Sequence, residues 1–251
     1  MRRIILSGKI GCFVFLLTAF PFLINGKTKA VVKPAYIASV ISVINLSSSA
    51  AVAAEAAILN DSIHLDSMGL SKKTLEYALK GYSYLQRKGL LPNKDILSIC
   101  DFSQSSKNKR LYIIDIENKK LILNTYVAHG KNSGSEFAKT FSNNPNTLKS
   151  SLGFYVTRDT YLGGHGLSLK IQGVEQGFND KAIRRNIVVH GSGYVGDVFV
   201  NSNNACGRSY GCPAVPSQES DMVINAIKNG SCLFIYHPTQ KYIKQSQILN
   251  S

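Results

Sequence analysis

Cys212 and His190 are the two residues of this sequence whose types and surroundings could carry out chemistry. Cys212 ends the segment GRSYGC (207–212), and a glycine just before a nucleophile allows a tight turn that exposes the sulfur and aims backbone N–H groups at one point. His190 stands in the apolar run IVVHG (187–191), where a strand would project its ring into a cleft. An imidazole there could take the thiol proton and return one to a leaving amine. We therefore predict a cysteine nucleophile with a histidine base.

The other cysteines offer a structural alternative. The sequence has five, which are Cys12, Cys100, Cys206, Cys212 and Cys232. In an oxidising compartment such residues form disulfides, and a bridge between Cys206 and Cys212 would silence the nucleophile. Cys100 and Cys232 lie in strand-like runs, where we expect either buried core thiols or a bridge.

Short strands must position the pair. Runs rich in Ile, Leu, Tyr and Val predict strands at 96–102, 110–116, 121–130, 153–161, 167–173, 187–191 and 232–238. Apolar residues at helical spacing predict a helix that begins after Ser71 and ends at Gly89, and a second helix lies near 218–228. The pattern indicates a mostly β (α+β) fold, a β-sandwich or barrel with short flanking helices and an N-terminal helical extension.

The N-terminal part is typical of an export segment. Arg2 and Arg3 precede the apolar run IGCFVFLLTAFPFLI (10–24), which is short for a membrane span and contains Pro21. We expect residues 1–30 to be a signal peptide, or else an uncleaved N-terminal anchor, and either would export the rest. An Ala/Ser-rich segment (31–70) follows, which could be a tether, a packed helix or part of a longer export segment. The main domain is expected at 71–245.

The chain is strongly basic, with 29 Lys+Arg against 15 Asp+Glu and a net charge of +14. Such a surface favours a polyanionic partner, which could be nucleic acid, an anionic wall polymer or a membrane surface. Because no basic cluster is interleaved with aromatic residues, we expect no nucleic-acid partner, and membrane contact only through the N-terminal segment if it stays attached. No HExxH or paired CxxC motif is present, so we expect neither a metal nor a cofactor.

Several blocks of the sequence resemble a known enzyme family. His190-Gly191 followed by SYGC (209–212) is similar to the signature of the YkuD-type L,D-transpeptidases. More closely, the chain resembles the murein L,D-transpeptidase catalytic-domain branch of that superfamily, over roughly residues 72–245. The blocks that carry this resemblance are HGKNSG (129–134), SSLGFYVT (150–157), FND (178–180), IVVHG (187–191) and GRSYGCPA (207–214).

The resemblance implies a mostly β catalytic domain that acts on peptidoglycan in the periplasm or cell envelope. Its cysteine would cleave the stem tetrapeptide after the third-position diamino acid, release D-alanine and form an acyl-enzyme. The side-chain amine of a second stem would then accept the acyl group, which gives a 3→3 crosslink. Carbapenems would act as covalent inhibitors. Hydrolysis by water, as in an L,D-carboxypeptidase or an amidase, and a non-enzymatic cell-wall-binding module remain as alternatives.

The family roles can be carried onto this chain residue by residue. Cys212 is the nucleophile, His190 the general base, and Gly191 the residue whose carbonyl orients the imidazole. The oxyanion hole and the shape of the nucleophile turn would come from Ser209, Tyr210 and Gly211, together with the backbone N–H of Cys212.

The chain departs from the commoner signature at two positions. That signature has His where this chain has Tyr210, and Arg where it has Ala214. Tyr is not a base near neutral pH, and the missing cation could be replaced by Arg208. We expect further substrate contacts from Arg208, and from the residues His129, Asn132, Ser133 and His165 of the two glycine-flanked loops.

Overall fold

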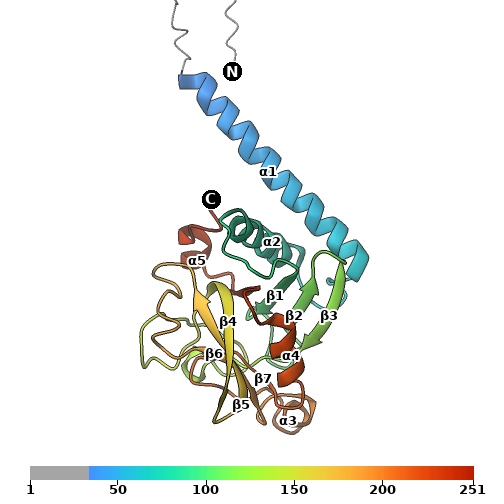
Figure 1. The fold of residues 1–251 in the computed structure, drawn as a ribbon, viewed down its shortest axis with the longest axis vertical. Coiled ribbons are helices and arrows are strands. Elements are labelled where there is room, and N and C mark those ends of the chain that lie inside the picture. The colour runs from blue at the N-terminus through green and yellow to red at the C-terminus, as the bar shows by residue number, and fades with distance from the viewer. Residues whose placement is uncertain (1–33) are drawn as a thin grey trace, which may run out of the picture. The chain divides into compact units, whose positions relative to one another are not determined.

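The computed structural model describes the backbone of residues 34–251 and side chains from residue 49 onwards. The expected signal peptide or anchor (1–30) lies outside these residues. The chain divides into two units, Met1–Val43 and Ile44–Ser251, and the following description concerns the second unit. Figure 1 shows its helices and its sheet.

The Ala/Ser-rich segment contains a long helix, α1 (Pro34–Ile63). The side chains of Ala56, Leu59 and Ile63, near its C-terminal end, are buried in the main hydrophobic core. Of the three possibilities left open by the sequence, this end of the segment is therefore a packed helix. Within residues 34–251, no helix has the length and apolar character needed to span a membrane.

The helix expected after Ser71 is confirmed as α2 (Lys72–Arg87). The Ser71 hydroxyl accepts a hydrogen bond from the N–H of Thr74 (3.1 Å), which satisfies one of the free donors of the first turn. Gly89 has φ +67°, the left-handed conformation that ends helices. One face of the helix is buried, and its large apolar side chains are Leu75, Leu79, Tyr82 and Leu85.

Eight strands form a single sheet in the order β3-β2-β1-β8-β4-β5-β6-β7. They are β1 (Ile96–Asp101), β2 (Leu111–Asp115), β3 (Lys120–Thr125), β4 (Gly153–Gly163), β5 (Gly166–Gly173), β6 (Val188–Ser192), β7 (Ala214–Pro216) and β8 (Cys232–Tyr236). β1–β8 and β6–β7 are parallel pairs, and the other pairs are antiparallel. Helix α4 (Ser220–Ile227), expected near 218–228, contacts strands in both halves of this sheet.

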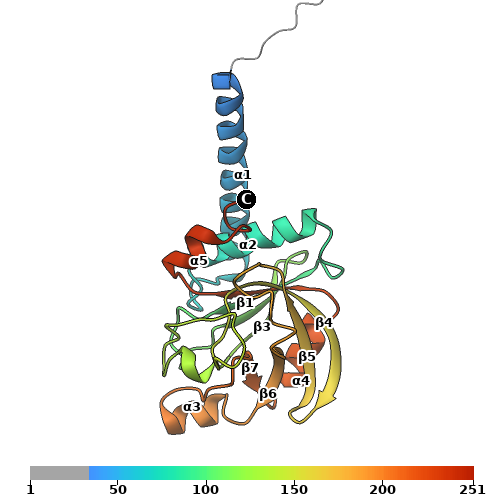
Figure 2. The ribbon, with the colours of Figure 1, turned by 90° about the vertical axis from the view of Figure 1, so that its left-hand side faces the viewer.

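The two ends of the sheet come close together. After β3 the chain runs on to Ala128, which forms a bridge with Ala214 in β7, the strand at the other end. The sheet is therefore a nearly closed barrel, and Figure 2 shows how the long β4–β5 hairpin curves around it. This confirms the expected fold class, a mostly β domain with short flanking helices.

The structure also contains elements that the sequence patterns did not predict. These are β7, α3 (Asp197–Asn203), α5 (Gln240–Gln245) and the single 3-10 turn η1 (Lys131–Ser133). The strand expected at 121–130 ends at Thr125, and isolated bridges replace its second half. All four cysteines among the described residues are unpaired, and Cys100, Cys206 and Cys232 are buried.

Candidate active site

Strands β6 and β7 bring His190 and the cysteine turn to one place. The two strands are parallel, and His190 is paired with Ala214. Cys212 lies two residues before Ala214, so the turn that carries the thiol leads directly into the strand beside the imidazole. The pairing of β7 with β6 therefore holds Cys212 close to His190.

The cysteine turn has a backbone that only glycine fits at position 211. Gly211 has φ +127°, and a Cβ there would lie 2.9 Å from the carbonyl oxygen of Lys149. The buried Ser209 hydroxyl holds the turn from both sides, because it donates to the carbonyl of Cys212 (2.6 Å) and accepts from the N–H of Gly211 (3.0 Å). The turn is therefore preorganised by its own residues.

The Cys212 thiol is partly buried beneath this turn. It accepts a hydrogen bond from the N–H of Val188 (3.5 Å) and donates to the carbonyl of Asn186 (3.7 Å). Burial raises the pKa of the Cys212 thiol, although the Val188 N–H and the charge of Arg185 oppose the increase. The thiol is therefore neutral near pH 7, and these contacts hold it in a resting position.

Arg185 is the cation that acts on this thiol. Its guanidinium donates to the carbonyls of Ser142 (2.7 Å) and Lys149 (2.6 Å) and to the Ser151 hydroxyl. Arg208, which the sequence suggested for this place, is exposed and donates instead to the carbonyl of Gly134 (3.3 Å). No sequence pattern points to Arg185, because its contacts depend on how the 181–187 segment folds back.

His190 has one ring nitrogen committed and one free. Its Nδ1–H donates to the carbonyl of Gly191 (2.9 Å), so Nε2 is left as the acceptor. Burial lowers the pKa of His190, the Gly191 bond opposes this, and His165 lowers it further. Gly191 also needs to be a glycine, since a Cβ would lie 2.8 Å from the Ser220 side chain.

The ring of His165 stacks on that of His190. The centroids are 4.4 Å apart and the planes differ by 24°. His165 sits on the exposed tip of the β4–β5 hairpin, between β4 and β5. It therefore belongs to the same site and covers one face of the imidazole.

The HGKNSG loop holds its own shape. His129 is completely buried, with Nδ1 2.9 Å from Arg110 and Nε2 3.3 Å from the carbonyl of Gly134. Burial and the Arg110 charge lower the pKa of His129 to about 4. In this position, His129 has no exposed surface for the substrate contact that the sequence suggested.

Ser133, in the same loop, is also buried, and its hydroxyl accepts a hydrogen bond from the N–H of Ser150 (2.9 Å). Asn132 is exposed, and its amide donates to the carbonyl of Thr147 (3.0 Å).

The backbone N–H groups of the cysteine turn are the possible donors to an oxyanion. The N–H of Gly211, expected in this role, is already bonded to Ser209. Among the described residues, the N–H groups of Tyr210 and Cys212 have no hydrogen-bond partner. The side chain of Tyr210 is 73% exposed, so it points away from the core.

Comparison with known protein families shows which family this chain belongs to. The model of the L,D-transpeptidase catalytic domain (YkuD_2) matches residues 66–236, which include both β6 and the cysteine turn. The chain belongs to this L,D-transpeptidase family. A search of curated proteins found no match.

Solved structures, two of them of L,D-transpeptidases, are similar to this chain at a low level. One from Mycobacterium smegmatis is 9% identical with a TM-score of 0.35, and the match covers 57% of this chain and 59% of that one. One from Enterococcus faecium is 12% identical with a TM-score of 0.34, covering 57% and 50%. The helical cell shape determining protein of Campylobacter jejuni is 15% identical with a TM-score of 0.38, covering 65% and 56%. The matched region thus spans less than two thirds of each of these proteins.

Proposed function

We propose that this chain is a peptidoglycan L,D-transpeptidase with Cys212 as nucleophile and His190 as general base. It cleaves a stem tetrapeptide after the third-position diamino acid, releases D-alanine and transfers the acyl group to the amine of a second stem in a 3→3 crosslink. The observation that carries this proposal is the His190–Gly191 bond, which leaves Nε2 free on the strand beside the cysteine turn.

The reaction begins from a neutral pair. Because the thiol pKa is raised and the imidazole pKa is lowered, neither group is charged near pH 7. Cys212 first gives up its contacts with Asn186 and Val188, and its S–H turns toward Nε2 of His190. Nε2 then takes the proton as the sulfur attacks the substrate carbonyl, so the imidazole acts as a true general base.

The tetrahedral intermediate carries a negative oxygen. The free N–H groups of Tyr210 and Cys212 are the donors that support an oxyanion hole here, in place of the expected Gly211 N–H. The imidazolium of His190 returns its proton to the nitrogen of D-alanine, the C–N bond breaks, and a thioester forms on Cys212. An acceptor amine then loses a proton to His190 as it attacks the thioester. The C–S bond breaks, and the imidazolium returns the proton to the sulfur, which restores the Cys212 thiol.

Muropeptide analysis tests this proposal. The full chain and a Cys212→Ala variant are incubated with tetrapeptide-rich sacculi, and the digested products are separated and identified by mass. We expect free D-alanine and new 3→3 dimers from the parent chain, and neither from the variant. Tripeptide monomers without dimers would mean that water replaces the amine and that the enzyme is an L,D-carboxypeptidase.

Carbapenem acylation tests the nucleophile on its own. Intact mass spectrometry should show one adduct on the parent chain and none on Cys212→Ala. Cys206→Ala is the matched control, because Cys206 is a buried, unpaired thiol of the same chain and should leave the adduct unchanged. An adduct on Cys212→Ala would disprove the assignment, and binding to sacculi without any acylation would favour a wall-binding module.

This function places the protein outside the cytoplasmic membrane, where peptidoglycan is crosslinked. We therefore propose that the chain is exported to the periplasm or cell envelope, with residues 1–30 as the export segment. Its partners are then peptidoglycan stem peptides, and carbapenems are its covalent inhibitors.

A further inference from the structure

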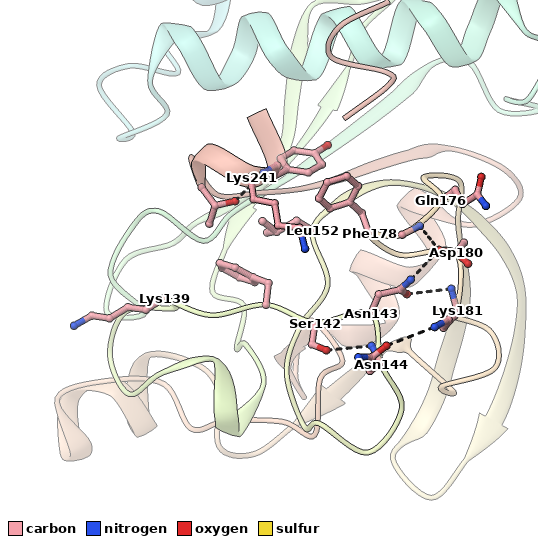
Figure 3. Close-up of a pocket in the computed structure, with 14 residues that line it drawn as sticks. Lys139, Ser142, Asn143, Asn144, Leu152, Gln176, Phe178, Asp180, Lys181 and Lys241 are labelled. Atoms are coloured by element: carbon pink, nitrogen blue, oxygen red, sulfur yellow. Dashed lines mark hydrogen bonds between the residues drawn. The ribbon is translucent and has the colours of Figure 1, made fainter. Parts of the chain in front are cut away.

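A pocket lies apart from Cys212 and His190. It has a volume of about 690 Å³ and is formed by residues from three stretches of chain, 139–144, 176–181 and 239–242, together with Leu152 (Figure 3). None of its lining residues is Cys212, His190 or His165. The reaction proposed above makes no use of this pocket, so its purpose needs a separate explanation.

Three lysines give the pocket a positive charge. Lys139, Lys181 and Lys241 line it, and within residues 49–251 none of them forms an ion pair. Asp180 is the acidic residue in the lining, and it already accepts bonds from the Asn143 amide (2.8 Å) and the N–H of Gly177 (2.6 Å). The Lys181 ammonium donates to the side-chain oxygen of Asn144 (3.5 Å), which is neutral, so the positive charge of the three lysines is not balanced by a paired carboxylate among the described residues.

The rest of the lining is fixed and partly apolar. Phe178 and Tyr242 pack edge to face with centroids 5.1 Å apart, and Leu152 is buried beside them. Asn143 is 9% exposed, and its side-chain oxygen accepts the N–H of Lys181 (3.1 Å). The pocket thus combines a preformed apolar floor with amides and ammonium groups, the mixture typical of a site for a polar ligand with methyl or methylene groups.

The arrangement of the lysines bears on the shape of the anion. They come from three separate stretches of chain, and in the view of Figure 3 Lys139 lies on the left, Lys181 on the right and Lys241 between them. A peptide with several carboxylates along its length could meet all three.

We propose that this pocket binds the carboxylate-bearing peptide of an uncrosslinked peptidoglycan stem, at a site separate from the reacting bond. The identity of this ligand rests on the proposed function, whereas the positive charge and the shape of the pocket do not. Such a stem carries carboxylates and small apolar side chains in alternation, which suits the ammonium groups and the apolar floor.

Arg185 connects the pocket with the nucleophile turn. Its guanidinium donates to the carbonyl of Ser142, which lines the pocket, and to that of Lys149. A Cβ on Gly211 would lie 2.9 Å from that same Lys149 oxygen and 3.3 Å from the guanidinium. A stem bound in the pocket is therefore held by the same wall that supports Cys212, which keeps it near the reaction.

A binding experiment with matched charge variants tests the inference. The full chain carrying Cys212→Ala is titrated by calorimetry with a soluble disaccharide tetrapeptide, alone and with Lys139, Lys181 and Lys241 all changed to Gln. The control changes Lys72, Lys94 and Lys244 to Gln, three exposed lysines outside the pocket. Any binding beside position 212 is common to both sets and cancels in the comparison.

We expect the pocket variant to bind about tenfold more weakly, about 1.4 kcal/mol, and the control to change by about twofold or less, as for exposed charges. The same muropeptide with amidated carboxylates should bind the parent as weakly as the native one binds the pocket variant. Equal losses in both variants, or full binding of the amidated ligand, would overturn the proposal. Displacement by millimolar inorganic phosphate, but not by equal chloride, would mean a phosphate-bearing polymer and would also overturn it.

Carbapenem acylation separates this inference from the proposed function. With Cys212 present, the pocket variant should be acylated as fast as the parent, because the lysines do not touch the thiol. If the parent itself is not acylated, the proposed function fails, while the binding comparison still decides whether the pocket is an anion site.

Discussion

The two rings at the centre of the site differ in exposure and in freedom. His190 is 5% exposed and tied to Gly191, whereas His165 sits at an exposed hairpin tip and covers one face of the buried ring. The charge of His165 lowers the pKa of His190, and the stacked ring shields one face of the imidazole from water. We therefore propose that His165 is a positioning residue that keeps His190 neutral for its proposed role as a base.

This relation predicts a pH effect. Since the pKa of His190 is lowered, the acid limb of carbapenem acylation should lie below pH 6.5 in the parent chain. His165→Phe keeps the ring cover but removes the charge, so the limb should move to higher pH. His165→Ala also exposes His190 to water and should move it further in the same direction. The measurement is the acylation rate between pH 5 and 8 by intact mass.

On the alkaline side of these profiles, all three proteins should react at similar rates, because His190 is neutral in each. Equal loss of rate at every pH would instead mean that His165 only binds the inhibitor. An unchanged profile in both variants would show that the stacked ring does not affect the base.

At this scale, the sequence allowed some roles to be predicted and hid others. Cys212, His190 and Gly191 were visible because local motifs place them at a turn and a strand end. The sequence does not reveal the hydrogen bonds of Arg185 or the complete burial of His129, from which a substrate contact is expected, since burial and proximity across the fold are not written in neighbouring residues. The bond from Ser209 to the Gly211 N–H is likewise visible only once the turn is folded.

At the scale of elements, the contact between α2 and the sheet depends on a missing side chain. Gly81 lies on the buried face of the helix, and a Cβ there would overlap the ring of Phe154 in β4. Phe154 itself is fully buried and stacks on Phe234 in β8 at 4.1 Å. The helix can therefore approach the sheet this closely because position 81 has no side chain.

We predict that Gly81→Ala destabilises the protein. On an exposed helix this change stabilises by up to about 1 kcal/mol through helix propensity, but here the added methyl must push Phe154 or the helix aside, which costs about 1–3 kcal/mol. The free energy of unfolding in urea should fall accordingly. Ser83→Ala, on the same helix but only half-buried, is the control and should stay within about 0.5 kcal/mol of the parent. A Gly81→Ala protein more stable than the parent would contradict this packing.

The elements also differ in how well the sequence predicts them. β1, β2, β4, β5, β6 and β8 lie in segments rich in Ile, Leu, Val and Tyr, so their existence could be predicted to within a few residues of their ends. β7 has three residues, Ala214–Pro216, and owes its existence to pairing with β6. Such an element has no pattern of its own, although it is the one that holds Cys212 beside β6.

At the scale of the whole molecule, one buried carboxylate joins distant parts of the chain. Glu175 accepts bonds from the N–H of Phe154 (2.8 Å), the hydroxyl of Tyr242 (2.8 Å) and the hydroxyl of Ser246. Glu175 lies at the start of the segment that leads to Arg185 and β6. Its bonds connect this segment with β4 and with the C-terminal helix α5. Burial raises the pKa of Glu175, and these three bonds oppose the increase.

We predict that Glu175→Ala lowers the free energy of unfolding by about 3 kcal/mol, because three buried donors lose their acceptor. Glu76→Ala removes only a surface ion pair with Lys73 (3.2 Å) and should cost less than about 1 kcal/mol.

Since its folded pKa is raised, Glu175 contributes most to stability in acid, and this part is lost as pH rises through that pKa. Glu175→Gln cannot ionise, so its stability relative to the parent should increase with pH in urea unfolding. A difference in free energy of unfolding between Glu175→Gln and the parent that stays constant with pH would contradict the raised pKa. A Glu175→Ala variant as stable as Glu76→Ala would mean that the carboxylate does not hold β4 and the C-terminal helix together.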